Sequence, residues 1–300
     1  MSTNENKGKK AEVTALQAIS AEDRKDWISL AFVQAGICVC VPAFLLGALL
    51  AEAMPIWPAI ISGSLGYLIV VVGMVATGMI GCDLGLASCT CCQAGFGKSG
   101  ARFIVSTIFA VNMIGWFGIQ NGVCGEAFSN AMLAMTGWDI PVVVSNTIWG
   151  IIMLLTAVYG VHALEKLDKI SIPLLMIIMC YGTFLAFKVY GTGNLNDEGT
   201  VQSMSFMSGV ALSFNFTAVG TITGPDYTRF QKSRKDTVKS VFYGVFPMGV
   251  ITLIMGIVLT KLSGQYDISM VLIEVGLPLL GIIAPVSYTH LRAHETLRHL

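Results

Sequence analysis

The chain has 300 residues, of which 54% are hydrophobic and only 12% are charged, and its mean hydropathy is +0.72. A soluble domain carries roughly a quarter charged residues, so this composition excludes an ordinary soluble protein. The net charge of zero indicates no particular partner, and we expect no nucleic acid among the partners. Apolar runs of about 20 residues, long enough to cross the roughly 30 Å hydrocarbon core, predict an all-α polytopic membrane protein.

Seven complete spans and the start of an eighth are predicted from these runs. The eighth begins near residue 270, and the complete spans lie near 28–51, 58–82, 103–125, 140–162, 170–190, 203–223 and 238–261.

Two of the spans contain helix-breaking residues. The first has Gly36 and Pro42 in its middle, and the sixth has Gly220, Gly224 and Pro225. Freed backbone groups at membrane depth are tolerated only where protein or a cavity satisfies them. Broken helices at corresponding positions of two halves are typical of transporters, so the pattern predicts a 5+5 inverted-repeat fold of the LeuT type.

The basic residues predict the orientation of the chain. Only Lys188 and Lys261 fall in loops on one side, and Arg292 and Arg298 lie in the last residues of the chain. All other Lys and Arg residues fall on the opposite side. The positive-inside rule therefore predicts a cytoplasmic N-terminus, in a multi-pass protein of the cell (inner) membrane.

Eight cysteines are distributed along the chain, three of them in the predicted cytoplasmic loop ASCTCCQAG. A metal site would need four ligands in a workable geometry, and no His or further Cys pair is placed to complete one. We therefore interpret Cys89, Cys91 and Cys92 as small residues of a packed loop. The other five are expected to fill space inside the spans: Cys38, Cys40, Cys82, Cys124 and Cys180.

The third span carries polar and aromatic residues at intervals of four: Asn112, Trp116 and Gln120. Such positions share one helix face, and Trp116 lies about 21 Å along the helix from Arg102, not far from the midplane. Polar side chains at this depth tend to line pathways or sites. A Trp surface beside an amide suits a small planar heterocycle, although a simple inter-helix hydrogen bond beside a packed Trp explains the pair equally well. Glycines on the other faces are expected to let neighbouring helices approach closely: Gly115, Gly118 and Gly122.

The last residues break the pattern of spans. The stretch PVSYTHLRAHETLRHL, residues 285–300, begins where the eighth span has crossed only part of the bilayer, and a helix should not stop there. We interpret it as a non-native tail rather than a His-rich metal segment, and the chain as a C-terminally truncated fragment.

Several of these stretches resemble the nucleobase–cation symporter family, on the bacterial cytosine permease branch. They are FVQAG, GWFGIQ, YGVHALEKLDKISIPLL and GTITGPDYTRFQKSRKD, within a similarity that runs from about residue 25 to 284. The resemblance implies that Trp116 stacks on the base, that Gln120 contacts its edge, and that Phe216 forms the other side of the sandwich. We add Asn112 to this expected substrate site.

The resemblance also implies coupling to a cation. The backbone carbonyls of Gly36 and Val39 are expected to face sodium, with the remaining ligands on span eight beyond this chain. No other cofactor is implied beyond Na⁺ or H⁺, and no obligate protein partner is inferred.

The predicted organisation has four parts. Residues 1–26 form a cytoplasmic tail, 27–190 the first five-helix repeat, 203–284 the start of an incomplete second repeat, and 285–300 the non-native tail. The predicted function is import of a nucleobase, cytosine first, by cation symport with alternating access.

Three alternatives stay open. One is transport of a related heterocycle, such as a purine, a hydroxymethylpyrimidine or a hydantoin such as allantoin. An intramembrane enzyme is disfavoured because there is no HExxH, no GxSxG and no Asp pair inside the spans. A non-transporting membrane sensor is disfavoured by the short loops.

Overall fold

The computed structural model describes residues 17–159, 161–196 and 202–275. Over these residues the chain is helical, and its only pairing of the β type is an isolated bridge between Lys25 and Gln231. The elements are η1 (Ala21–Asp23), α1 (Trp27–Cys38), α2 (Val41–Ala53), α3 (Ile56–Leu84), α4 (Ser88–Cys91), α5 (Gln93–Gly100), η2 (Ala101–Val105), α6 (Ser106–Thr136), α7 (Val142–Tyr159), α8 (Val161–Tyr190), η3 (Gly193–Asn196), α9 (Phe206–Thr217), α10 (Val219–Thr228), α11 (Arg234–Ser263) and α12 (Ile268–Glu274).

The helices agree with the predicted spans. Within the described residues, five helical segments are long and apolar enough to cross a membrane, and α1 with α2 forms a sixth candidate that bends by 54°. The remaining predicted span is α7, whose apolar part is shorter. The eighth begins with α12, and its continuation and the stretch 285–300 lie outside the described residues.

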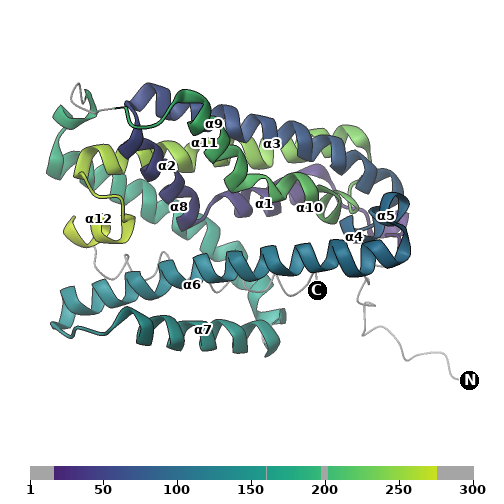
Figure 1. The fold of residues 1–300 in the computed structure, drawn as a ribbon, viewed down its shortest axis with the longest axis horizontal. Helices are drawn as coiled ribbons and strands as arrows, with labels where there is room; N and C mark the ends of the chain where they lie inside the picture. Colours follow the sequence, from purple (N-terminus) through teal and green to yellow (C-terminus); the bar gives the residue numbers. More distant parts are fainter. Residues whose placement is uncertain (1–16, 160, 197–201, 276–300) are drawn as a thin grey trace, which may run out of the picture.

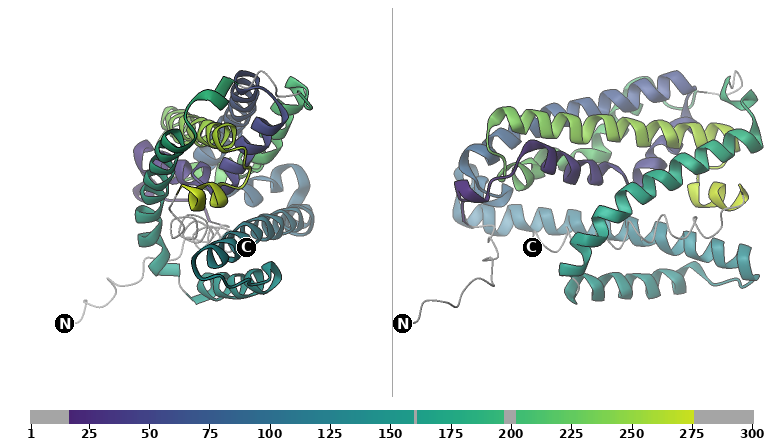
Figure 2. Two further views of the ribbon diagram at one scale, coloured as in Figure 1. Left: turned by 90° about the vertical axis from the view of Figure 1, so that its left-hand side faces the viewer. Right: turned by 180° about the vertical axis from the view of Figure 1, so that it is seen from behind.

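The helices are arranged as a bundle with a separate pair beside it. Helices α1, α2, α3, α9, α10 and α11 pack against one another in the bundle. In Figure 1, α6 and α7 lie side by side below it, and Figure 2 shows α8 crossing obliquely from this pair to the bundle.

Close helix contact in the bundle depends on glycine at two facing positions. A Cβ on Gly47 of α2 would overlap the carbonyl of Leu253, and a Cβ on Gly256 of α11 would overlap the carbonyl of Phe44. Without a hydrophobic driving force between helices in lipid, such close backbone packing holds the pair together.

The same role was wrongly predicted for the glycines of α6. No described residue lies within 4 Å of the place where a Cβ would sit on Gly115, Gly118 or Gly122. These glycines lie away from the face through which α6 meets its neighbours, so they bring no described helix close.

The sixth span is not broken where the sequence predicted. Helices α9 and α10 meet at Ala218, whose backbone stays helical (φ −54°, ψ −32°), and together they form one apolar segment, Phe206–Thr228, that continues through Pro225. Proline has no N–H to donate to the carbonyl four residues earlier, which here is Thr221. The hydroxyl of Thr77 on α3 donates to that carbonyl instead, at 2.6 Å, and so replaces the missing bond.

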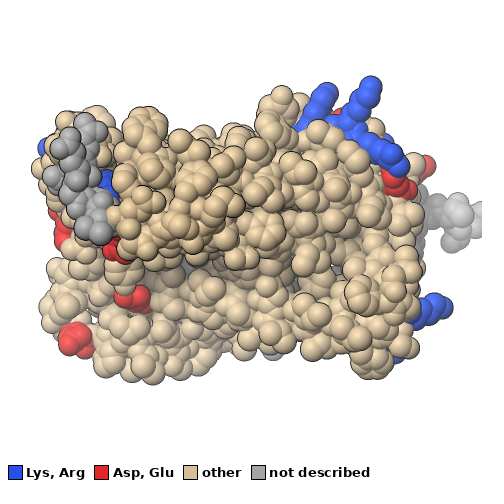
Figure 3. Space-filling view, turned by 45° about the horizontal axis from the view of Figure 1, so that its top comes forward, with Lys and Arg blue, Asp and Glu red and all other residues tan. Residues whose placement is uncertain are grey.

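Most of the visible basic side chains gather at one end of the molecule, where α10 ends and α11 begins (Figure 3). The N-terminal segment is attached to this end, because the Lys25 amide donates to the Phe230 carbonyl at 2.7 Å and the Arg24 side chain donates to the Gln231 carbonyl at 3.1 Å. On the same end, Arg234 of α11 donates to the carboxylate of Asp83 at the end of α3.

Candidate functional site

The site is built around the break in the first span. Helix α1 ends at Cys38, and Val39 (φ −84°, ψ 81°) and Cys40 (φ −147°, ψ 150°) are not helical. Pro42 then occupies the first turn of α2, where its missing N–H has no cost. The sequence therefore permits a helix on either side of these two residues, with the chain turned between them.

This break leaves two carbonyl groups without a hydrogen bond from the part of the chain that the structure describes. The Cys40 amide donates to the Cys38 carbonyl at 3.1 Å instead of reaching back to Gly36. The Ala43 amide donates to the Cys40 carbonyl at 3.0 Å instead of to Val39. As a result, the carbonyls of Gly36 and Val39 accept no hydrogen bond from any described residue.

A polar contact from α11 supports the end of α1. The hydroxyl of Thr252 lies 3.3 Å from the Cys38 carbonyl, and it also lies 2.9 Å from the carbonyl of Gly249 in its own helix. Thr252 could not be found from the sequence, because a single threonine in an apolar span carries no signal of its partner.

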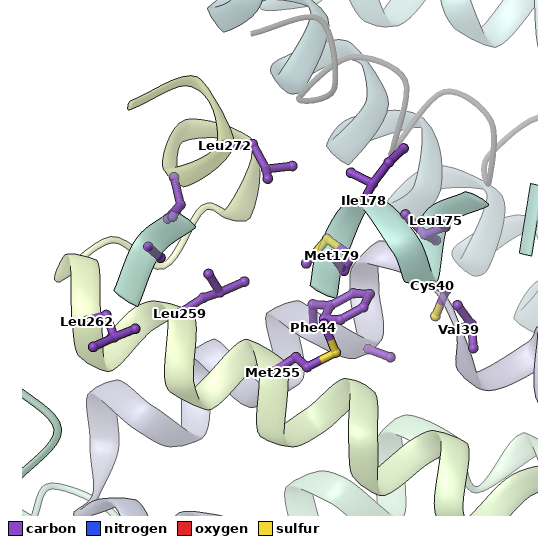
Figure 4. Close-up of a cluster of buried hydrophobic side chains, with 13 residues drawn as sticks. Val39, Cys40, Phe44, Leu175, Ile178, Met179, Met255, Leu259, Leu262 and Leu272 are labelled. Atoms are coloured by element: carbon purple, nitrogen blue, oxygen red, sulfur yellow. The ribbon is translucent and has the colours of Figure 1, made fainter. Parts of the chain in front are cut away.

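Buried apolar side chains surround the break. Val39 and Cys40 lie in one cluster with Phe44 of α2, Met179 of α8 and Met255 of α11, as Figure 4 shows. Val39 is completely buried and Cys40 is 3% exposed. The free carbonyls are therefore next to a low-dielectric core in which a charge would need polar ligands.

The third span turns its polar face inward, as the spacing predicted. Gln120 is only 4% exposed and Asn112 and Trp116 are half-buried, whereas Val111 and Ile114 on the opposite face are 64% and 69% exposed. The Oδ1 atom of Asn112 is buried and has no hydrogen-bond partner among the described residues.

Two aromatic rings from different helices meet beside the break. Trp116 of α6 and Phe216 of α9 have ring centroids 5.2 Å apart and ring planes at 77°, an edge-to-face contact. Phe216 also packs against the cluster that contains Val39 and Cys40. The structure thus brings Trp116 into contact with Phe216, and Phe216 against the apolar cluster that also contains the break.

The cysteines are distributed between the bundle and a loop. Cys38, Cys40, Cys82 and Cys124 are buried as predicted, but Cys180 is exposed, because it lies on the outward face of α8. Cys89, Cys91 and Cys92 are half-buried on and just after the short helix α4, and burial raises the pKa of each thiol above its ordinary value. At neutral pH a smaller fraction of each thiol is deprotonated than in an ordinary cysteine, which makes these residues poor nucleophiles.

A bent first span beside an aromatic pair, in a polytopic protein that is helical over its described residues, is the architecture typical of membrane transporters. The chain belongs to the family described as permease for cytosine/purines, uracil, thiamine, allantoin, whose model matches residues 19–281. The fold agrees with a LeuT-type transporter: the nucleobase–cation symport transporter Mhp1, in a closed conformation with bromovinylhydantoin bound, superposes with a TM-score of 0.79. That match is 17% identical and covers 96% of this chain and 68% of Mhp1.

Curated relatives belong to the same group of permeases. The cytosine permease of Escherichia coli K12 is 28% identical over 264 residues, which are 87% of this chain and 61% of that protein. The allantoin permease of Bacillus subtilis is 23% identical over 249 residues, 75% of this chain and 50% of the relative. A purine–uracil permease of Arabidopsis thaliana is 26% identical over 73% of this chain and 41% of its own length. The chain thus spans about three fifths or less of these relatives.

Proposed function

We propose that this protein imports a nucleobase, cytosine first, by symport with sodium or protons across the inner membrane. The base binds between the bent first span, the sixth span and α6, and relative motion of the bundle and the α6–α7 side exposes it to each face in turn. The observation that carries the proposal is the contact of Trp116 with Phe216 beside the break.

The aromatic contact indicates how a planar ring is received. A base stacked between two rings needs van der Waals distances of about 3.5 Å on each side, so the rings must separate to about 7 Å. Their present separation is 5.2 Å, in an edge-to-face arrangement. Binding therefore requires Phe216 to turn or α9 to shift, while Gln120 and Asn112 supply hydrogen bonds to the edge of the base.

The free carbonyls of Gly36 and Val39 support the cation part of the proposal. Hard cations such as sodium take oxygen ligands, and the two carbonyl oxygens freed by the break are suitable ligands. The remaining hydroxyl ligands are expected on the eighth span, outside the described residues. A cation that binds better to the outward-open state raises the affinity for the base there, and the base raises the affinity for the cation by the same factor.

A second candidate is import of a related heterocycle. It is favoured by the allantoin and purine–uracil permeases among the relatives and by the hydantoin bound to Mhp1. An aromatic pair accepts any flat ring. The substrate is therefore selected by the polar groups that contact the edge of the ring, which include Gln120 and Asn112.

The test is equilibrium binding to the full-length gene product purified in detergent. Tryptophan fluorescence is followed during titration with cytosine, uracil, adenine, hypoxanthine and allantoin, with and without sodium. Sodium-dependent quenching by cytosine is the expected result. Quenching by another heterocycle alone would replace cytosine by that substrate, and no response to any of them would overturn the nucleobase assignment.

A further inference from the structure

The contact between α6 and α7 contains a reciprocal pair of asparagine and glycine residues. The sequence NGVCG begins at Asn121 and ends at Gly125 on α6, and NTIWG begins at Asn146 and ends at Gly150 on α7. The two helices lie side by side (Figures 1 and 2). Each segment is Asn-x-x-x-Gly, so in both helices the two residues are one turn apart on one face.

Each asparagine packs onto the glycine of the other helix. A Cβ on Gly125 would overlap the Oδ1 atom of Asn146, and a Cβ on Gly150 would lie 3.2 Å from the Nδ2 atom of Asn121. The absent side chain of each glycine is thus the space that the facing asparagine fills. We call these four residues the Asn–Gly clasp.

Hydrogen bonds fasten the clasp in both directions. Asn121 Nδ2 donates to the backbone carbonyl of Asn146 at 3.1 Å, and the neighbouring Ser145 hydroxyl donates to the carbonyl of Gly125 at 2.8 Å. Each bond runs from a side chain of one helix to the backbone of the other. Such bonds and small residues fix how two helices face each other in a membrane.

The clasp lies next to the candidate substrate site in the sequence. Gln120 directly precedes Asn121, and Trp116 lies just over one turn earlier on the same helix. Helix α6 meets its described neighbours through one face at this level, because Ile114, Gly118 and Ile119 are exposed on its other side. With side chains reaching about 6 Å from the axis, a rotation of 30° moves a side-chain tip by about 3 Å. A shift of that size removes a positioned group from its ligand.

We propose that the Asn–Gly clasp sets the rotation of α6, and that Asn121 is the positioning residue that keeps Gln120 directed at the substrate. This inference rests on the proposed function, because Gln120 is the group that it positions. Asn121 itself contacts α7 and not the substrate.

The first test is a double-mutant cycle on base affinity in the full-length gene product. Gln120→Ala and Asn121→Ala are each expected to weaken binding of the preferred base about tenfold. If Asn121 acts through Gln120, the double variant is also about tenfold weaker, since the second change removes nothing more. An additive loss of about a hundredfold, or an unchanged affinity for Asn121→Ala, would overturn the proposal. If Asn121→Ala does not fold, Gly150→Ala replaces it in the cycle. That substitution crowds the side-chain amide of Asn121 without removing it.

Ser129→Ala is the matched control. The Ser129 hydroxyl also bonds a carbonyl across this helix junction, that of Ile140, but it lies about 12 Å further along α6 from Asn121. We expect it to lower thermal stability as Asn121→Ala does while leaving base affinity within twofold. Equal losses of affinity in both variants would show that the Asn–Gly clasp only stabilises the fold and does not position Gln120.

The second test needs no base and so separates this proposal from the proposed function. A cysteine at position 120 in a cysteine-free background is expected to react slowly with a maleimide, since Gln120 is 4% exposed. Adding Asn121→Ala should accelerate the reaction at least fivefold, and adding Ser129→Ala should not. No acceleration would overturn the clasp, whereas acceleration in a protein that binds no base would leave the clasp standing and remove only the nucleobase assignment.

Discussion

At the scale of the residue, the site combines flat apolar surface with few polar groups. Trp116 and Phe216 are in direct contact, and the amides of Gln120 and Asn112 lie on the same helix face as Trp116. The aromatic surface would bind planar rings in general, and the amides would discriminate among them by their edges. Affinity and selectivity should therefore respond to different substitutions.

Trp116→Ala should abolish or greatly weaken base binding. Loss of one stacking surface costs about 1–3 kcal/mol, which corresponds to roughly 5- to 150-fold in the dissociation constant. Calorimetric titration measures the change without relying on tryptophan fluorescence. Trp138→Ala is the control, because Trp138 is 68% exposed beyond the end of α6. An unchanged affinity in Trp116→Ala would refute the stacking role.

Gln120→Ala should change which base is preferred. A buried site that donates to and accepts from the edge of a base rejects analogues whose edge does not match, and an alanine removes that discrimination. Competition of each heterocycle against radiolabelled cytosine gives the selectivity profile. If that profile keeps its order while all affinities fall together, Gln120 does not read the edge.

At the scale of the element, the interruptions in the spans are compensated by neighbouring helices. Pro225 leaves the Thr221 carbonyl without its helical donor, and Thr77 supplies a hydroxyl from α3. At the first span the Thr252 hydroxyl approaches the Cys38 carbonyl in a similar way, but no described residue donates to the carbonyls of Gly36 and Val39. The two spans therefore differ: the sixth stays one helical segment, whereas two carbonyl oxygens of the first accept no hydrogen bond from a described residue.

Thr77→Val should destabilise the protein by about 1 kcal/mol, because it leaves the partly buried Thr221 carbonyl without this donor. In a Pro225→Ala background the helix can supply its own N–H, so the same substitution should cost much less. Thermal unfolding in detergent of the four variants measures this coupling. Equal costs in both backgrounds would show that Thr77 does not replace the bond lost at Pro225.

Gly256→Ala should lower stability by several kcal/mol or prevent folding, because the added Cβ overlaps the Phe44 carbonyl and separates α11 from α2. Gly115→Ala is the matched control, and it should be neutral or slightly stabilising, since no described residue lies near its Cβ position. Size-exclusion profiles and melting temperatures of both variants test this. A strong loss in Gly115→Ala would mean that this face is covered after all.

At the scale of the whole molecule, charge separates the two ends. The described basic residues are concentrated where α10 meets α11, and Lys188 and Lys261 are at the ends of α8 and α11 on the other side. Positive charge is retained on the cytoplasmic side during insertion, so the end that holds Arg234 is expected to face the cytoplasm.

Cysteine labelling in membrane vesicles tests that orientation. In a cysteine-free background, a cysteine at Lys235, beside the basic loop, should react with an impermeant maleimide only in inside-out vesicles. A cysteine at Gly193, which follows α8, should react only in right-side-out vesicles. The reverse pattern would overturn the predicted orientation.

In the unmodified protein, the thiols of Cys89, Cys91 and Cys92 should react slowly with a maleimide at pH 7 and faster as the pH rises, because burial raises their pKa.

The positions of the spans and the inward face of α6 were predictable from the sequence. The length of an apolar run is a local property of the sequence, and a run long enough to cross the bilayer forms a helix there. Asn112, Trp116 and Gln120 share one face because their spacing of four matches the helical period. The break in the first span was predicted within a few residues, because Gly36 and Pro42 weaken the helix there. In the sixth span the same reasoning failed, because the structure compensates Pro225 through Thr77, 144 residues away.

The sequence by itself therefore determined that this is a multi-span membrane protein, where its helices run, and which face of the third span is polar. Only the tertiary structure decided that the rings of Phe216 and Trp116 meet edge to face, that Gly256 and not Gly115 brings described helices together, and that Asn121 and Asn146 clasp facing glycines. The physical reason is that hydropathy and helical period act within one segment. A ring contact, a close backbone approach or a hydrogen bond between helices depends on which segments the fold places side by side.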